Sequence, residues 1–176
     1  MTDTAAPPPN GGALGVFELF LDRLDWLMSK LVIASMAVMV TVVVAQVFLR
    51  YVLNISLDWA EELSRLSFVW SVFFAIPLGI KRGAHVGVSL ITDRLPIPMQ
   101  STLFRIMSAL AAIMMAVVAY EAALLTKEQW DEPMSTLDIS IGLFMVPLCV
   151  GAIHALLHLI FGVFNGPPPK PDLSAE

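Results

Sequence analysis

The stretch "LVIASMAVMVTVVVAQVFLR", residues 31–50, contains no charged side chain before Arg50. An α-helix rises about 1.5 Å per residue, so residues 31–49 reach across most of the roughly 30 Å hydrocarbon core of a bilayer. We therefore predict that residues 31–49 form a transmembrane helix, which Arg50 and Tyr51 end at one membrane surface.

Three further runs are long and mainly apolar, with a few charged residues near their ends, at residues 62–80, 103–125 and 139–161. The chain is 57% hydrophobic and 14% charged, whereas soluble domains are about 45–50% apolar and about 25% charged. The segments between the runs are too short to bury a core of their own, which excludes a soluble catalytic domain. The sequence thus predicts an all-α integral membrane protein with four transmembrane helices and no enzymatic activity.

The two ends of the chain, residues 1–15 and 166–176, are polar and rich in Pro or Gly, so we expect disordered tails around one membrane domain, residues 16–165. Residues 17–31 show helical periodicity before the first span. The segment is either an amphipathic helix lying in the membrane interface or the water-facing end of the first span. Its apolar face would carry Phe17, Phe20, Leu21, Leu24, Leu27, Met28 and Leu31, and its polar face Glu18, Asp22, Asp25 and Ser29.

The distribution of Lys and Arg predicts the orientation in the membrane. Most basic residues lie on the side of the two termini, and Arg50, Arg65 and Lys127 lie on the other side. The positive-inside rule then places both termini in the cytoplasm.

Six residues at the end of the first span and the start of the second form what we call the charge cluster: Arg50, Asp58, Trp59, Glu61, Glu62 and Arg65. Glu61 and Arg65 have the spacing of a helical ion pair, and Arg50 can approach Glu62 from the first span. Arg65 lies a full turn inside the second span, where a charge is costly unless it is paired. The cluster can brace the first two helices, contact a partner protein or conduct an ion. Its distance from the membrane midplane favours the first two roles over ion conduction.

The segment "RYVLNISLDWAEELSRLSFVW", residues 50–70, followed by "KRGAHVGV", residues 81–88, resembles the small membrane subunit of tripartite ATP-independent periplasmic (TRAP) transporters, the DctQ-like subunit. The matching pattern is an Arg-Tyr pair, Asn and Ser, then Trp-x-Glu-Glu-x-x-Arg and a later Trp. The resemblance is one of sequence over residues 31–96. For the remainder of the chain it rests on the number of spans. The resemblance implies a location in the inner membrane of a bacterium.

This resemblance implies a non-enzymatic companion of a large multi-spanning subunit, which moves an organic acid inward using an ion gradient. The small subunit would scaffold that subunit and help to dock a periplasmic solute-binding protein. A stand-alone transporter acting as a homo-oligomer is the alternative, but it would need polar groups at the midplane of several spans. Gln46 alone does not provide them.

Other polar residues also have candidate roles. Lys81, Arg82 and His85 are candidates for contacts on the cytoplasmic side, with anionic lipid or a partner, and Glu121 either contacts a partner or extends to the interface. His154 and His158 have metal-binding spacing, but no acid or Cys of the fourth span faces them, so we expect contact with another helix or a lipid headgroup. No metal, cofactor or nucleic-acid partner is expected, and membrane lipid surrounds the chain.

Overall fold

The computed structural model describes residues 13–81 and 96–166. The described elements are α1 (Ala13–Val52), α2 (Asp58–Lys81), α4 (Ile97–Glu128), a short 3-10 helix η1 (Ile141–Phe144) and α5 (Val146–Asn165). Four of these segments are long and apolar enough to cross a membrane, with η1 and α5 together forming the last one. The prediction of an all-α protein with four transmembrane helices is confirmed.

The first helix differs from one of the two expectations for residues 17–31. α1 is one continuous helix of 40 residues, about 60 Å long, so no separate interfacial helix precedes the first span. The sequence has neither Pro nor Gly between Val16 and Val52, and nothing interrupts the backbone hydrogen bonding there. The amphipathic segment is the first part of the spanning helix itself.

The ends of the other helices follow from local chemistry. α4 begins after Pro96 and has a proline in its first turn, where the missing N–H costs nothing. The last membrane segment opens with η1, which Ser140 caps by accepting the backbone N–H of Gly142 on its hydroxyl at 3.0 Å. α5 ends at Gly166, whose φ of 79° lies in the left-handed region that glycine adopts without strain.

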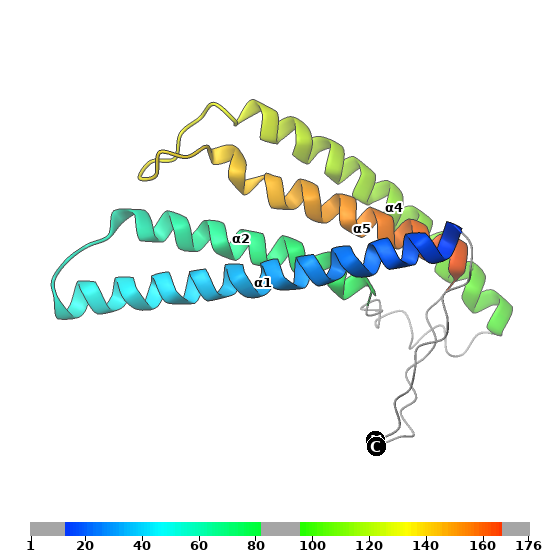
Figure 1. Cartoon of the computed structure of the whole chain (residues 1–176). Coiled ribbons are helices and arrows are strands. Elements are labelled where there is room, and N and C mark those ends of the chain that lie inside the picture. The colour runs from blue at the N-terminus through cyan, green and yellow to red at the C-terminus, as the bar shows by residue number, and fades with distance from the viewer. Residues whose placement is uncertain (1–12, 82–95, 167–176) are drawn as a thin grey trace, which may run out of the picture.

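The helices lie side by side in one layer, in the order α1, α2, α5, α4 (Figure 1). α1 and α4 therefore form the two edges. The long first helix also crosses the end of α5, where the rings of Phe17 and Phe161 lie 6.0 Å apart. The first turns of α1 and the last turns of α5 thus meet at the same end of the layer.

Small residues line the contact between α2 and α5 in the middle of the layer. A Cβ added to Gly151 would lie 2.5 Å from the backbone oxygen of Phe73, so the two backbones touch there. Such close approach is typical of helix packing in membranes. The indole N–H of Trp70 donates to the backbone oxygen of Leu143 at 3.0 Å and joins α2 to η1. The buried small residues of the two helices are Ala60, Ser67, Ser71, Gly151, Ala152 and Ala155.

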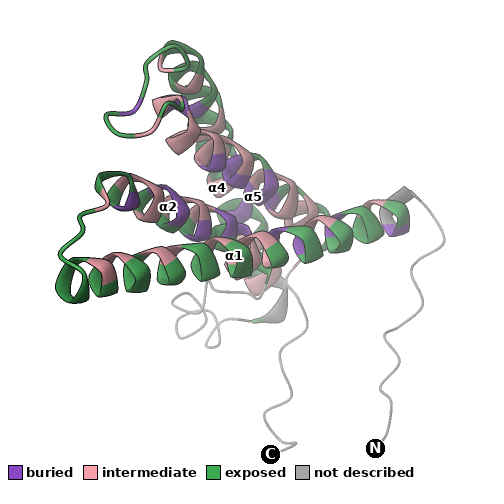
Figure 2. Cartoon of the chain, turned by 60° about the vertical axis from the view of Figure 1, so that its left-hand side comes forward, coloured by how far each residue is buried: buried purple, intermediate pink, exposed green. Residues whose placement is uncertain are grey.

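The outer face of α1 is apolar and uncovered (Figure 2). None of the residues in its most hydrophobic 18-residue window is buried within the chain. In water such a surface would drive aggregation. The chain therefore needs lipid, or a partner helix, along this face.

Candidate functional site

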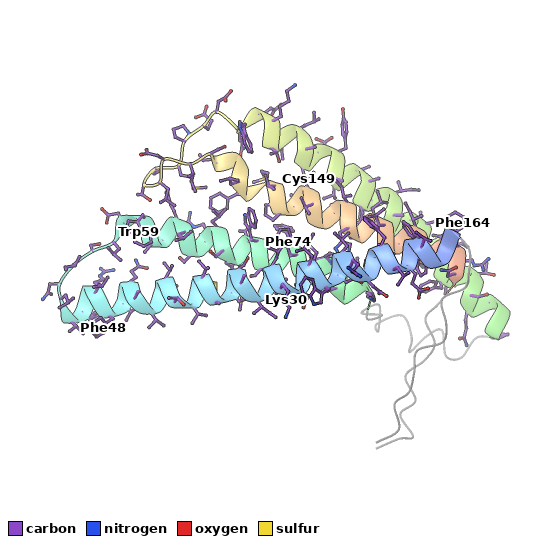
Figure 3. All side chains as sticks on the ribbon, in the orientation of Figure 1. Lys30, Phe48, Trp59, Phe74, Cys149 and Phe164 are labelled. Atoms are coloured by element: carbon purple, nitrogen blue, oxygen red, sulfur yellow. The ribbon has the colours of Figure 1, made fainter. Side chains whose placement is uncertain are left out.

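The charge cluster lies at the end of the layer where α1 stops and α2 starts. Phe48 and Trp59 mark this end in Figure 3, opposite Phe164. Arg65 Nη2 lies 2.7 Å from Glu61 Oε1, and the two side chains are 62% and 72% exposed. Because the pair is surrounded by solvent or headgroups, it adds little to the stability of the chain and remains available to a partner.

Glu62 faces away from this pair and accepts four hydrogen bonds from the loop before η1. Its carboxylate takes the backbone N–H groups of Ser135, Thr136 and Leu137 at 3.0, 3.0 and 3.1 Å, and the Thr136 hydroxyl at 2.6 Å. The pairing of Arg50 with Glu62 considered from the sequence is not formed, and the carboxylate bonds the loop instead. Among the described residues Arg50 forms no hydrogen bond or ion pair.

The loop that Glu62 holds has a defined structure. Pro133 and Ser140 form an antiparallel bridge, and the N–H of Met134 donates to the oxygen of Ile139 at 2.9 Å. Met134 is buried, with 7% exposure. Glu62 therefore fixes a folded loop against the start of α2, which links the first half of the chain to the second.

The remaining predicted residues have few contacts. Asp58 accepts a hydrogen bond from the hydroxyl of Ser56 at 3.3 Å. Trp59, in the first turn of α2, is 40% exposed. Glu121 is exposed on α4 and has no ion pair within the described ranges. Arg82 and His85 lie outside the described residues.

A second polar site, not predicted from the sequence, lies where α1 crosses α5. We call it the histidine cluster; it consists of Asp22, Asp25, Lys81, His154 and His158. The Nε2 atoms of His154 and His158 lie 2.9 and 2.7 Å from the same oxygen, Oδ1 of Asp25, and 3.2 Å from each other. The three side chains are only 1%, 7% and 9% exposed, for His154, His158 and Asp25 in that order.

The sequence-based placement of Asp25 on the polar face of residues 17–31 is wrong. Asp25 is buried together with Leu21 and Met28, which lie four residues before and three residues after it. That spacing places all three on one helical face. The expectation that no acid faces His154 and His158 held only for residues of their own span, since the acid beside them, Asp25, comes from α1.

Lys81 completes the cluster from the last residue of α2. Its Nζ lies 2.6 Å from Oδ2 of Asp25 and 2.6 Å from Oδ1 of Asp22. Both oxygens of the buried Asp25 are thus bonded, which offsets the cost of a carboxylate away from water. Lys81, 44% exposed, and Asp22, 55% exposed, form the open side of the cluster.

Comparison with known proteins gives a consistent result. Residues 39–166 match the model of the family described as tripartite ATP-independent periplasmic transporters, DctQ component. The sialic acid TRAP transporter small permease protein SiaQ of Vibrio cholerae is 28% identical over 135 residues, which are 74% of this chain and 75% of that protein. The C4-dicarboxylate TRAP transporter small permease protein DctQ of Rhodobacter capsulatus is 25% identical over 108 residues, 61% of this chain and 48% of that protein.

A longer relative is also similar. The isethionate TRAP transporter permease protein DctMQ of Oleidesulfovibrio alaskensis is 27% identical over 111 residues, which are 59% of this chain but only 17% of that protein. The family match covers the last third of α1 and all of α2, α4 and α5. The chain is a membrane subunit of a transporter, not an enzyme, and it belongs to the DctQ component family of TRAP transporters.

Proposed function

We propose that this chain is the small permease subunit that supports a large multi-spanning subunit in the inner membrane and helps to dock a periplasmic solute-binding protein. The large subunit would carry an organic acid inward, driven by an ion gradient. The uncovered apolar face of α1 is the observation that carries the proposal. A helix at the edge of a one-layer protein offers a long surface against which another membrane protein packs.

The charge cluster supports the same interface. The Arg65–Glu61 pair is exposed near the start of α2, at the end of the layer where α1 ends. Exposed charges at the rim of an apolar surface set the register and choice of partner more than they add affinity. The folded loop held by Glu62 lies at the same end, so both features would face the periplasm and extend the platform for the binding protein.

The relatives support the solute class and the partner. Their names specify sialic acid, C4-dicarboxylates and isethionate, which are all organic acids. The isethionate permease protein is far longer than the region that resembles this chain, which favours a small subunit working beside additional membrane sequence. The positive-inside bias supports cytoplasmic termini.

Site-specific crosslinking tests the proposed interface. A photoreactive residue replaces Val44 on the outer face of α1, which is 62% exposed, or Ile113 on α4, which is 64% exposed, as the matched control. After illumination of native membranes, the tagged chain is purified and its adducts are identified by mass spectrometry. We expect one large multi-spanning protein attached at Val44 and lipid only at Ile113.

Two other outcomes contradict the proposal. An adduct between two copies of this chain at Val44, with no larger protein, would favour the stand-alone homo-oligomeric transporter. Adducts with the large protein at Ile113 but not at Val44 would place the interface on α4 and overturn the role given to α1.

A further inference from the structure

We infer that Asp25, His154 and His158 form a binding site for one divalent transition-metal ion of the zinc class. Their three ligand atoms come from two helices and converge on one point. Nothing in the proposed transport role requires such a site, so the two proposals stand separately.

The distances match one face of a metal coordination shell. The two Nε2 atoms and Oδ1 of Asp25 form a triangle with sides of 2.7, 2.9 and 3.2 Å. In a tetrahedral zinc site with bonds of about 2.0–2.1 Å, neighbouring ligand atoms are roughly 3.3 Å apart. An ion is therefore accommodated when the sides of the triangle lengthen by about 0.1–0.6 Å.

Without an ion the same atoms are crowded. A neutral imidazole has one N–H, so both rings can bond Asp25 only by directing two N–H groups at one oxygen. The two Nε2 atoms would then face each other at 3.2 Å as donors. A bound ion accepts a lone pair from each Nε2 and removes this conflict. Nδ1 of His154 has no hydrogen-bond partner among the described residues. No described neighbour of Nδ1 therefore holds the ring in the tautomer that carries its proton on Nε2.

Lys81 supplies the outer support that metal ligands usually have. It bonds Oδ2 of Asp25 and leaves Oδ1 facing the histidines. Metal-ligating carboxylates are commonly held in this way by a second group. The two carboxylates and one ammonium of the cluster leave one net negative charge when the imidazoles are neutral, which favours a cation.

The ligand set also selects the kind of ion. Two imidazole nitrogens and one carboxylate oxygen suit zinc and its neighbours, whereas magnesium and calcium prefer oxygen ligands. Water can supply the fourth ligand through the open side at Lys81 and Asp22. The bound ion would join α1 to α5 at their crossing.

Cobalt substitution tests the site in the full chain. The protein is purified in mild detergent with a tag that contains no histidine, treated with chelator and titrated with Co²⁺. We expect about one Co²⁺ ion per chain and the intense visible absorption bands of four-coordinate cobalt. Added Zn²⁺ should displace the Co²⁺ and remove these bands. A wild-type chain that shows no such bands overturns the proposal.

Variants locate the site. His158→Gln should weaken Co²⁺ binding by more than the about 100-fold typical of losing an outer-shell group. Glu18→Gln, at an exposed position of α1 outside the cluster, should stay within a few-fold of wild type. Equal binding by His158→Gln and wild type contradicts the inference. Should His158→Gln fail to fold, X-ray absorption of zinc on the wild-type chain decides: two imidazole ligands support the site, and fewer overturn it.

Discussion

The carboxylate of Glu62 holds the backbone N–H of Thr136, a residue 74 positions further along the chain, at 3.0 Å. The hydroxyl of Thr136 and the N–H groups on either side of it bind the same carboxylate. An acid in the first turns of α2 therefore determines the conformation of the loop that leads into η1 and α5. The contact depends on the carboxylate geometry, because a second oxygen and full negative charge are needed to accept four donors.

Replacing Glu62 by Gln should release this loop. The amide offers one acceptor oxygen in place of two, so the N–H groups of residues 135–137 lose their partner and exchange with solvent faster. Hydrogen–deuterium exchange of a peptide covering residues 129–140 measures the effect. Glu61→Gln, next in sequence but bonded to Arg65, is the control and should leave that peptide unchanged. Equal protection in both variants would show that the loop is held by its own bonds.

Gly151→Ala should separate α2 from α5. The new Cβ would lie 2.5 Å from the Phe73 oxygen, and backbone cannot move aside as a flexible side chain can. We expect a loss of about 1–3 kcal/mol in the free energy of unfolding, typical of overpacking. Thermal unfolding in detergent reports it.

Gly162→Ala is the matched control on the same helix. Its Cβ would meet the Phe104 ring at 3.5 Å, an ordinary contact. Because alanine favours helix more than glycine, this variant should be neutral or more stable by up to about 1 kcal/mol. A Gly151→Ala protein as stable as Gly162→Ala would contradict the close approach of α2 and α5.

Asp25→Asn should destabilise the crossing of α1 and α5 even when chelator keeps metal away. Lys81 loses its buried ion-pair partner, and the two histidines lose a charged acceptor. Breaking a fully buried pair costs about 3–5 kcal/mol, and we expect about 2 kcal/mol here because the Lys81 side chain is 44% exposed. Asp22→Asn, at a 55% exposed position, should cost less than about 0.5 kcal/mol. Equal losses in the two variants would show that burial of Asp25 is unimportant.

Arg65→Ala should impair assembly with the large subunit and solute uptake while leaving the fold intact. The side chain is 62% exposed and its i,i+4 pair with Glu61 contributes only about 0.3–0.5 kcal/mol. Co-purification from native membranes, with thermal unfolding in parallel, separates the two effects. Lys127→Ala, exposed at the end of α4, is the control. Normal co-purification together with normal uptake in Arg65→Ala would remove this residue from the interface.

The proposed orientation predicts which end of the layer is labelled from outside the cell. In a Cys149→Ser background, which removes the single native cysteine, Ser135→Cys should react with a membrane-impermeant maleimide in intact spheroplasts. Phe164→Cys, 71% exposed at the opposite end, should react only after permeabilisation. The reverse pattern would invert the topology.

The membrane helices could be predicted from sequence because hydropathy over about 20 residues is a local property. Residues 31–49, 62–80 and 103–125 all lie within the helices that the structure describes, although each helix is longer than its apolar run. Helix ends such as the η1 turn before Val146 depend on the Ser140 cap and on bonds to residues of the preceding loop. These features leave no hydropathy signal.

The two polar sites could be predicted only in part. The Glu61–Arg65 pair follows from spacing within one helix. The partners of Glu62 are backbone N–H groups, which every non-proline residue has, so the sequence gives no sign of them. Asp25 and His158 are 133 positions apart, and only the crossing of α1 over α5 brings them together. The one available signal was a charged residue on the face of Leu21 and Met28.

The order α1, α2, α5, α4 also has a mechanical consequence. A closed bundle encloses a lumen between its helices, and transporters place their solute sites in such interiors. Within residues 13–81 and 96–166, a row one helix thick encloses no interior that could open in turn to the two faces of the membrane. The row would act as a rigid support. The conformational changes of a transport cycle would then take place in the protein that packs against it.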